Sequence, residues 1–246
     1  MTLYVDKTPI PRPRVRKPPP RPRHDAVAHV RPEARVVVLA KSPGGMGART
    51  KLAHAIGGPD AALVYHRLLE RTLRHLARGE VFPVVAVPPR SIEFRALALR
   101  GGARTHTQAC GSLGQRIARC VRGHGGPTIV VDSDTPAIDG LLVRHAAEAL
   151  GFYDLVLGPT WNGGYYLAGL RAPGYAFGLF KGVRWGTTHV LDDTLARAPR
   201  HWKVGLLPVL ADANDAALMD EAAEDFAPPR RRSSSLGVIS MKSRGR

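Results

Sequence analysis

The stretch Arg35-Val-Val-Val-Leu-Ala40 continues directly into the glycine-rich segment Lys41-Ser-Pro-Gly-Gly-Met-Gly47. A short run of β-branched residues without a polar interruption is typical of a strand buried on both faces of a parallel sheet. A second run of this kind, Thr128-Ile-Val-Val-Asp132, ends in Ser133-Asp134. Strands of this type need helices on both sides of the sheet, and amphipathic helical patterns separate them here. We therefore expect a three-layer α/β/α domain with a mainly parallel sheet.

The patterns of strands and helices alternate along the chain. The sequence predicts strands at 35–40, 82–87, 104–108, 128–132, 154–158, 164–169 and 203–209, and helices at 59–79, 91–99, 113–122, 138–150, 187–198 and 214–226. Open sheets built in this way bind ligands at the carboxyl ends of their strands. The loops that follow the strands are therefore where a site is expected.

The basic charge of the chain is concentrated at its two ends. The 246 residues carry a formal net charge of +16, and 44% of them are hydrophobic. Residues 1–32 and 228–246 contain much of the excess Arg and Lys, and seven of the 21 prolines fall within Pro9–Pro22. Segments of this composition have little apolar surface to bury. We expect two disordered tails around one domain at 33–227. Solvated tails are favoured over a contact with nucleic acid or an anionic surface.

The cysteine content and the hydropathy of the sequence are typical of a cytoplasmic protein. Cys110 and Cys120 are too few for a disulfide scaffold. No apolar run reaches the roughly 18 residues of a membrane span, and no apolar segment of signal-peptide length opens the chain. We therefore expect a cytoplasmic location without a membrane span.

The loop after the first strand combines glycines with cations. Gly45 and Gly47 allow a close approach of the backbone, while Lys41, Arg49 and Lys51 supply positive charge. A helix N-terminus that follows such a loop adds a favourable dipole for an anion. The loop matches neither a Walker loop nor the dinucleotide fingerprint. We expect it to bind phosphate, and the alternative is a flexible glycine turn.

Two aspartates lie at the end of the strand predicted at 128–132. Asp132 is its last residue, and Asp134 comes after it with one residue between them. Asp132 and Asp134 in extended chain form a pair that can hold Mg²⁺ or Mn²⁺ together with nucleotide phosphates. The alternative is a turn, or a cap on the helix after Pro136. A third loop, at 158–166, combines paired glycines with aromatic residues. It forms either a wall of a substrate site or a tight hairpin, and spacing alone leaves both open.

These loops occur in a fixed order with other short motifs. The series is Lys41-Ser-Pro43, Arg49-Thr-Lys-Leu52, Gln108 with Leu113-Gly-Gln-Arg116, Ser133-Asp-Thr-Pro136, Gly158-Pro159, Gly163-Gly-Tyr-Tyr-Leu-Ala-Gly169, Trp185-Gly-Thr-Thr188 and Asp212-Ala-Asn214. It resembles an uncharacterised bacterial family of glycosyltransferase-like proteins with the nucleotide-diphospho-sugar transferase (GT-A) fold. It is similar, more distantly, to molybdenum-cofactor and phosphoenolpyruvate guanylyltransferases. The resemblance covers about 33–226.

The resemblance implies roles for individual residues. Asp134 would be the metal aspartate, Asp212 would approach the same metal from a later strand, and Asp132 is the weaker candidate for it. The loop with Lys41 would grip the donor. Gln108 and Arg116 would lie near the nucleotide. The acceptor would be bordered by Asn162, Gly163, Gly164, Tyr165, Trp185 and Thr187.

The activity implied by this resemblance is metal-dependent transfer from a nucleotide-activated donor, and in the first instance glycosyl transfer from a nucleotide-sugar. One alternative is nucleotidyl transfer from a nucleoside triphosphate to a small phosphorylated acceptor, with release of pyrophosphate. A second alternative is a degenerate, non-catalytic nucleotide-binding protein, because Asn162 and Asn214 stand where the family carries acids.

Overall fold

The computed structural model describes residues 15–16, 34–40, 58–123 and 125–211. Eight strands lie in these ranges: β1 (Val15–Arg16), β2 (Arg35–Leu39), β3 (Val84–Val87), β4 (Arg104–Thr107), β5 (Thr128–Asp132), β6 (Leu155–Pro159), β7 (Tyr165–Leu170) and β8 (Val204–Leu206). The helices are α2 (Gly58–Arg78), α3 (Ile92–Arg100), α4 (Leu113–Arg122), α5 (Gly140–Ala149), the 3₁₀ turn η1 (Pro173–Tyr175), α6 (Ala176–Phe180) and α7 (Val190–Arg197).

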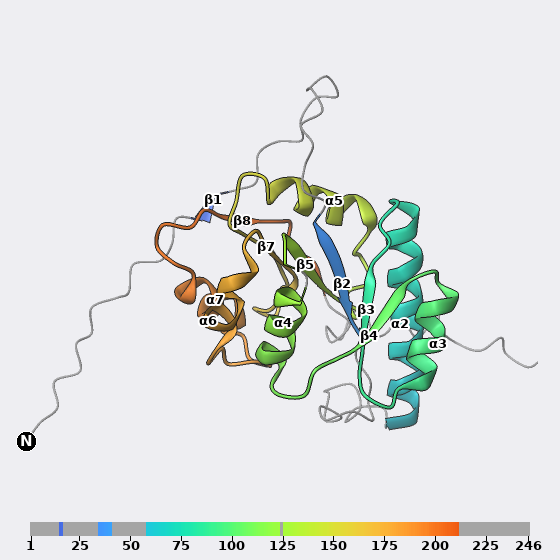
Figure 1. Cartoon of the computed structure of the whole chain (residues 1–246). Coiled ribbons are helices and arrows are strands. Elements are labelled where there is room, and N and C mark those ends of the chain that lie inside the picture. Colours follow the sequence, from blue (N-terminus) through green and yellow to red (C-terminus); the bar gives the residue numbers. More distant parts are fainter. Residues whose placement is uncertain (1–14, 17–33, 41–57, 124, 212–246) are drawn as a thin grey trace, which may run out of the picture.

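The strands form one sheet in the order β1-β8-β6-β7-β5-β2-β3-β4 (Figure 1). Strand β7 runs antiparallel to its neighbours β5 and β6, and every other neighbouring pair is parallel. The carboxyl ends of β2, β3, β4, β5, β6 and β8 therefore share one edge of the sheet. We call this edge the strand-end edge.

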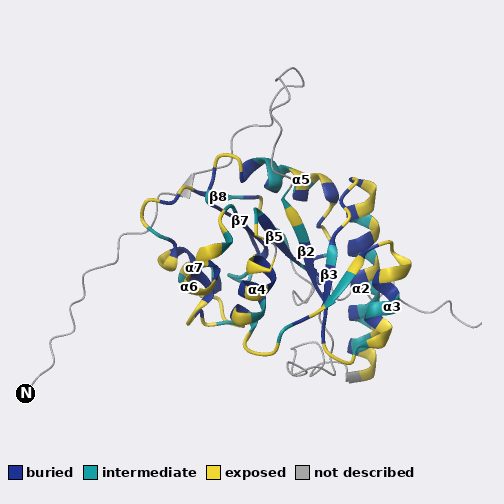
Figure 2. Cartoon of the chain, in the orientation of Figure 1, coloured by how far each residue is buried: buried dark blue, intermediate teal, exposed yellow. Residues whose placement is uncertain are grey.

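Helices cover both faces of the sheet. One buried cluster joins α2, α3 and α5 to residues such as Val38, Val85 and Ile129, and a second joins α4, α6 and α7 to Val37 and Val130. The strand residues alternate between the two clusters because successive side chains of a strand point to opposite faces. In Figure 2 the central strands are buried, and the helices expose one side only. The three-layer α/β/α arrangement and the mainly parallel sheet are confirmed.

Strand β1 corrects part of the expectation for the N-terminal tail. Val15 and Arg16 were included in a disordered segment, but they pair in parallel with Val204 and Gly205 of β8 and form the edge of the sheet. These two residues lie between Pro13 and Pro18, in a window whose backbone N–H groups remain able to donate. Extended proline-rich chain is also close to strand geometry. The other residues of both predicted tails lie outside the described ranges.

Two further elements differ from the sequence-based expectation. The segment from η1 through α6 was not predicted as helical, since Pro173, Gly174 and Gly178 are typical of loops. Its apolar residues Leu179 and Phe180 are buried, and the segment packs on α4. Tertiary packing therefore overrides a poor helical propensity. The helix expected at 214–226 lies outside the described residues.

The last turn of α2 and the first turn of α5 meet at two glycines. A Cβ atom added at Gly140 would lie 2.6 Å from the Cα atom of Gly79 and 2.7 Å from the carbonyl oxygen of Leu76. We expect Gly140→Ala to lower the free energy of unfolding by about 2 kcal/mol, because backbone atoms would have to move apart. Urea denaturation measures this change. The matched control is Gly178→Ala in α6, where an added Cβ meets nothing within 4 Å. If both variants are equally stable, the close approach is not a constraint.

No helix in the described part of the chain has the length and apolar character needed to cross a bilayer.

Candidate active site

The strand-end edge brings together residues that are far apart in the sequence. Ala40 follows β2, Gln108 follows β4, and Asp132 ends β5. Arg116, in the first turns of α4, reaches the same edge and bonds to Gln108. Three of the predicted site residues, Gln108, Arg116 and Asp132, thus lie at the edge where a ligand is expected.

The side chain of Gln108 joins the ends of β2 and β3 and also bonds to Arg116. We call this bonded pair the Gln108–Arg116 brace. The Gln108 side chain is 3% exposed, and Nε2 donates to the carbonyl oxygens of Ala40 at 2.6 Å and Ala86 at 2.7 Å. Its Oε1 accepts a hydrogen bond of 2.9 Å from Nη1 of Arg116. Both amide hydrogens are therefore committed within the protein. This geometry makes Gln108 a positioning residue for the strand ends and for Arg116, and its predicted place near the nucleotide stays a prediction.

Arg116 carries the positive charge of this edge. Helix α4 begins with a capping box, in which Ser112 and Gln115 satisfy each other's backbone N–H groups. Burial lowers the pKa of Arg116, while Cys120 and then Asp132 raise it. The guanidinium stays protonated, since an arginine does not lose its proton in a protein. Its Nε is buried and has no hydrogen-bond partner among the described residues. A cation with unused donor capacity thus lies close to the Asp132 carboxylate.

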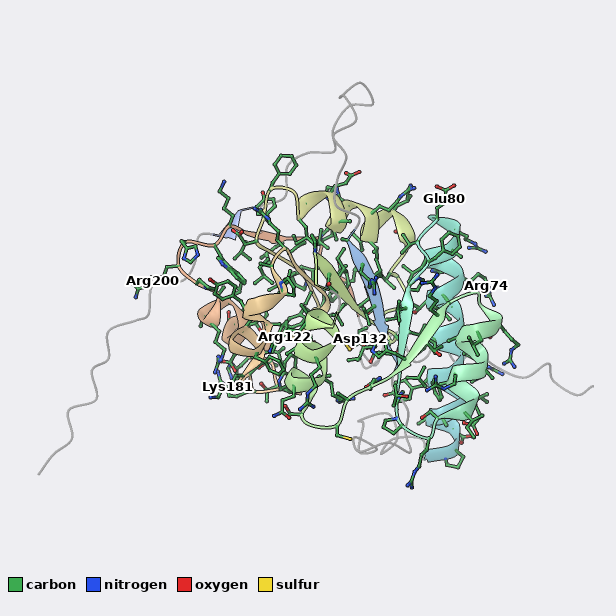
Figure 3. All side chains as sticks on the ribbon, in the orientation of Figure 1. Arg74, Glu80, Arg122, Asp132, Lys181 and Arg200 are labelled. Carbon is green, nitrogen blue, oxygen red and sulfur yellow. The ribbon has the colours of Figure 1, made fainter. Side chains whose placement is uncertain are left out.

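Asp132 and Asp134 differ in exposure. Asp132 is half-buried beside α4 (Figure 3), and its Oδ1 accepts a hydrogen bond of 2.8 Å from the backbone N–H of Ser133. Asp134 is 1% exposed. The helix that follows begins at Gly140 and is capped by Asp139, whose carboxylate accepts from the N–H of Leu142 at 2.8 Å. Asp134 is therefore not the cap of that helix, which removes one alternative for its role.

The two carboxylates fit the requirements of Mg²⁺ in part. No group of three or more His, Cys, Asp or Glu side chains suited to a metal occurs among the described residues. Mg²⁺ is commonly held by one or two carboxylates, with water and substrate phosphates completing the shell. Asp132 and Asp134 meet that smaller requirement. The other residues predicted for phosphate and metal lie outside the described ranges: Lys41, Gly45, Gly47, Arg49, Lys51 and Asp212.

The paired glycines belong to a tight turn between β6 and β7. Asn162 Oδ1 accepts from Thr160 Oγ1 at 2.8 Å and from the N–H of Gly164 at 3.1 Å. Gly163 has φ of +82°, and an added Cβ would lie 2.1 Å from the carbonyl oxygen of Thr188. Of the two readings left open by the sequence, the structure shows the tight hairpin. Asn162, Gly163 and Gly164 shape the turn, and their predicted contact with an acceptor stays a prediction.

Tyr165 and Trp185 pack against each other rather than projecting freely. Their rings meet edge to face, with centroids 6.0 Å apart, and the Tyr165 hydroxyl accepts from Thr194 at 3.4 Å. Burial raises the pKa of Tyr165. Thr187 is exposed, and its hydroxyl donates to the Arg184 carbonyl at 2.7 Å. These contacts hold the segment before α7 against β7, so Thr187 is the most accessible of the three for an acceptor.

Two residues of this edge lie in segments that the sequence analysis singled out, but it gave neither of them a role of its own. Thr135, directly after Asp134, is 1% exposed, and its hydroxyl has no hydrogen-bond partner in the described part of the chain. Trp161 is 76% exposed on the turn after β6, where its backbone N–H donates to the carbonyl oxygen of Leu210. Position next to the Asp132-Ser-Asp134 motif was the available signal for Thr135. An aromatic residue inside a turn pattern was the signal for Trp161.

Comparisons with known proteins agree with this architecture. A family model described as "Uncharacterized protein conserved in bacteria (DUF2064)" matches residues 72–187. A crystal structure from Desulfovibrio desulfuricans G20, provisionally named a nucleotide-diphospho-sugar transferase, is 26% identical with a TM-score of 0.66. The match covers 82% of this chain and 91% of that one. The resemblance stated from the sequence and the GT-A-type fold are thereby confirmed. No curated protein matches the sequence.

Two more distant solved structures share the arrangement to a lesser degree. A homologue of Mycobacterium tuberculosis Rv0371c, from Mycobacterium sp. strain JC1, is 15% identical with a TM-score of 0.51, over 80% of this chain and 98% of that one. It supports the fold alone. Glucosyl-3-phosphoglycerate synthase from M. tuberculosis, crystallised with Mn²⁺, UDP and glucosyl-3-phosphoglycerate, is 14% identical. Its TM-score is 0.47, over 78% of this chain and 75% of that one. A likeness of this size carries no argument about function.

Proposed function

We propose that the protein is a metal-dependent transferase that uses a nucleotide-activated donor. Residues 72–187 match the family model described as "Uncharacterized protein conserved in bacteria (DUF2064)", which names no activity. More specifically, we propose a glycosyltransferase that acts on a nucleotide-sugar. The name of the D. desulfuricans protein, 26% identical over 82% of this chain, supports nucleotide-sugar transfer. A cytoplasmic location and tails without a nucleic-acid partner remain part of this proposal.

One observation carries the proposal: Asp132 ends the central strand β5 at the strand-end edge and Asp134 follows it, with the bonded pair of Gln108 and Arg116 at the same edge. The carboxylates can hold a cation, and Arg116 supplies a fixed positive charge close to Asp132. Such an arrangement of fixed charges suits a ligand with a diphosphate group.

These charges suggest which residues would hold the metal and which would hold the phosphates. Asp134 and Asp132, with Asp212, would hold Mg²⁺ or Mn²⁺, and the metal when bound would neutralise charge on the diphosphate. Lys41, Arg49 and Lys51, together with the glycines of their loop, would hold the phosphates. Arg116, fixed by Gln108, would orient the donor. In glycosyl transfer, the bond between the anomeric carbon and the diphosphate oxygen breaks, and the acceptor hydroxyl forms the new bond.

Two other activities remain as outcomes of the test. Nucleotidyl transfer from a nucleoside triphosphate uses the same charges but breaks a phosphoanhydride bond and releases pyrophosphate. A non-catalytic nucleotide-binding protein is favoured by one observation, that Asn162 is an uncharged residue committed to its own turn.

A ligand screen followed by product analysis tests the proposal. Nucleotides and nucleotide-sugars are first screened by thermal shift with and without Mg²⁺, since a ligand at 100 times its dissociation constant adds about 2.7 kcal/mol of stability. We expect a nucleotide-sugar to stabilise the protein only with Mg²⁺. The matching reaction with an acceptor panel is expected to release nucleoside diphosphate. Release of pyrophosphate would indicate nucleotidyl transfer, and binding without either product would indicate the non-catalytic alternative.

A further inference from the structure

Trp161 is a large aromatic side chain that the fold leaves exposed. It is 76% exposed on the turn between β6 and β7. The two other tryptophans are engaged in ring contacts, Trp185 with Tyr165 and Trp202 with Tyr175. Trp161 has no ring contact among the described residues. Single exposed apolar residues are common on protein surfaces, so the surroundings of Trp161 decide what it indicates.

The backbone that carries Trp161 is fixed from two sides. Its N–H donates to the carbonyl oxygen of Leu210, after β8, at 3.3 Å. The carbonyl oxygen of Gly163 accepts from the N–H of Leu191, in α7, at 2.9 Å. Gly163 itself packs so closely on Thr188 that no side chain fits there. A ligand that binds to this turn therefore meets a backbone that needs little ordering, which lowers the cost of binding.

An apolar surface extends from Trp161 to the chain after β8. Thr160 and Leu210 form a parallel bridge, and Thr160 is buried there. Successive side chains of extended chain point to opposite sides, so Trp161 and Val209 both face away from the buried side. Val209 is 51% exposed. We call Trp161 and Val209 together the apolar shelf.

Polar groups border the apolar shelf on the α7 side. The turn that carries Trp161 packs against Thr188, and the residues on either side of Thr188, which are Thr187 and His189, are exposed. A hydroxyl can donate and accept, and a neutral imidazole offers one donor and one acceptor. A flat aromatic surface beside such groups suits a ligand that has one apolar face and several hydroxyls.

The apolar shelf and the Gln108–Arg116 brace lie on opposite sides of β5 at the strand-end edge. From β5, the sheet continues through β7 to β6 and β8 in one direction, and through β2 to β3 and β4 in the other (Figure 1). Strand β6 is two strands from β5, or roughly 10 Å at the usual strand spacing. Asp132, at the end of β5, therefore lies between the shelf and the brace. The predicted phosphate loop follows β2, on the brace side, so a donor held there would direct its glycosyl group toward the shelf.

We propose that the apolar shelf is the platform on which a pyranose ring of the acceptor stacks, so that Trp161 selects a carbohydrate acceptor. One face of a pyranose ring is formed by C–H groups, which fit the negative face of an aromatic ring. The ring hydroxyls project around the rim, where Thr187 and His189 are available to bond to them. The assignment of this ring to the acceptor rests on the proposed glycosyl transfer.

Saturation-transfer-difference NMR with methyl pyranosides tests the platform. The probes are the methyl glycosides of glucose, galactose, mannose and N-acetylglucosamine, added to the full chain in Mg²⁺ without any nucleotide. We expect at least one of them to bind, with the strongest saturation at its ring C–H protons. The emission of Trp161 is expected to shift to shorter wavelength at the same time, because the sugar ring displaces water from the indole.

Substitutions of Trp161 measure the contribution of its ring. Trp161→Ala is expected to weaken the affinity of the bound pyranoside about tenfold, because one face of the sugar then stays in water. Trp161→Phe keeps an aromatic face, so we expect binding to persist while the shift in tryptophan emission is lost. The matched control is Phe152→Ala, which removes an aromatic side chain that is 62% exposed before β6, at the opposite edge of the sheet. We expect this control to bind like the wild type, and all three variants to keep its melting temperature.

Four outcomes would overturn the proposal. The first is that none of the methyl pyranosides binds. The second is that Trp161→Ala binds its pyranoside as tightly as the wild type. An equal loss in Phe152→Ala would show that the effect does not belong to the shelf. Uridine or guanosine that binds more tightly than any pyranoside, and is lost in Trp161→Ala, would assign the shelf to the base of the donor.

The platform and the transferase activity can fail separately. Pyranoside binding that depends on Trp161, in a protein that binds no nucleotide in the thermal-shift screen, would keep the platform and overturn the transferase proposal. Turnover of a nucleotide-sugar that is unchanged in Trp161→Ala would keep the transferase and overturn the platform.

Discussion

Gln108→Leu is expected to lower the free energy of unfolding by about 3 kcal/mol, because the Ala40 carbonyl and Nη1 of Arg116 would be left without these partners, at about 1–3 kcal/mol each, while the Ala86 carbonyl keeps the backbone N–H of Ala40. Leucine has nearly the shape of glutamine but neither donates nor accepts. The carbonyl oxygens of Ala40 and Ala86 would each lose a donor, and Nη1 of Arg116 would lose its acceptor. Urea denaturation followed by circular dichroism measures the change.

The control for this variant is another glutamine of the same region. Gln115→Leu removes an exposed side chain whose Oε1 accepts one hydrogen bond, from the N–H of Ser112. Loss of a helix cap contact costs about 1 kcal/mol. A Gln108→Leu protein no less stable than Gln115→Leu would show that the brace contributes little to the fold.

Gln108 contributes both to the stability of the fold and to the position of Arg116 at the candidate site. The charge of Asp132 acts on Arg116 and raises its pKa, and Gln108 fixes one nitrogen of Arg116. Gln108→Glu separates the two functions, because it keeps an acceptor for Arg116 but loses both donors to the strand ends. We infer that the orientation of Arg116 depends on the fold of three strands rather than on α4 alone.

The sequence was informative about elements and much less so about contacts. The strand at 128–132 was predicted because a short run of β-branched residues is typical of a buried strand, and the structure has β5 at the same bounds. The brace was not predicted, because it joins Gln108 to Ala40 across 68 positions and to backbone atoms that any residue carries. No local pattern distinguishes a glutamine that binds a ligand from one that binds two strands.

The same distinction applies to the loops of the site. The sequence left Asp134 as a metal ligand or a helix cap, since several positions after a strand can begin a helix. The structure begins the helix at Gly140 and gives the cap to Asp139. For the paired glycines the sequence left a substrate wall and a tight hairpin as alternatives. The carbonyl oxygen of Thr188 packs so close to Gly163 that a side chain is excluded there. Both results depend on where a distant segment packs.

Asp134→Asn is expected to remove the Mg²⁺-dependent part of donor binding, with a loss of more than tenfold in affinity. Asparagine keeps the size of aspartate but is an uncharged and weaker ligand for a hard cation. The helix cap is unaffected, because Asp139 supplies it. We therefore expect the Asp134→Asn protein to remain folded without ligand. Titration of the nucleotide or nucleotide-sugar found in the thermal-shift screen, with Mg²⁺ and with EDTA, measures the effect.

Asp139→Asn is the matched control, since it changes an exposed carboxylate of the same loop into a residue that caps about equally well. Its stability and its Mg²⁺ dependence are both expected to match the wild type. An Asp134→Asn protein with unaltered Mg²⁺ dependence would make the buried carboxylate structural. In that case we expect Asp134→Asn to lower the stability of the protein strongly, because a carboxylate that is 1% exposed keeps its charge only when it is paired or hydrogen-bonded. The metal would then have to be held by Asp132 with groups outside β5, and the non-catalytic alternative would gain support.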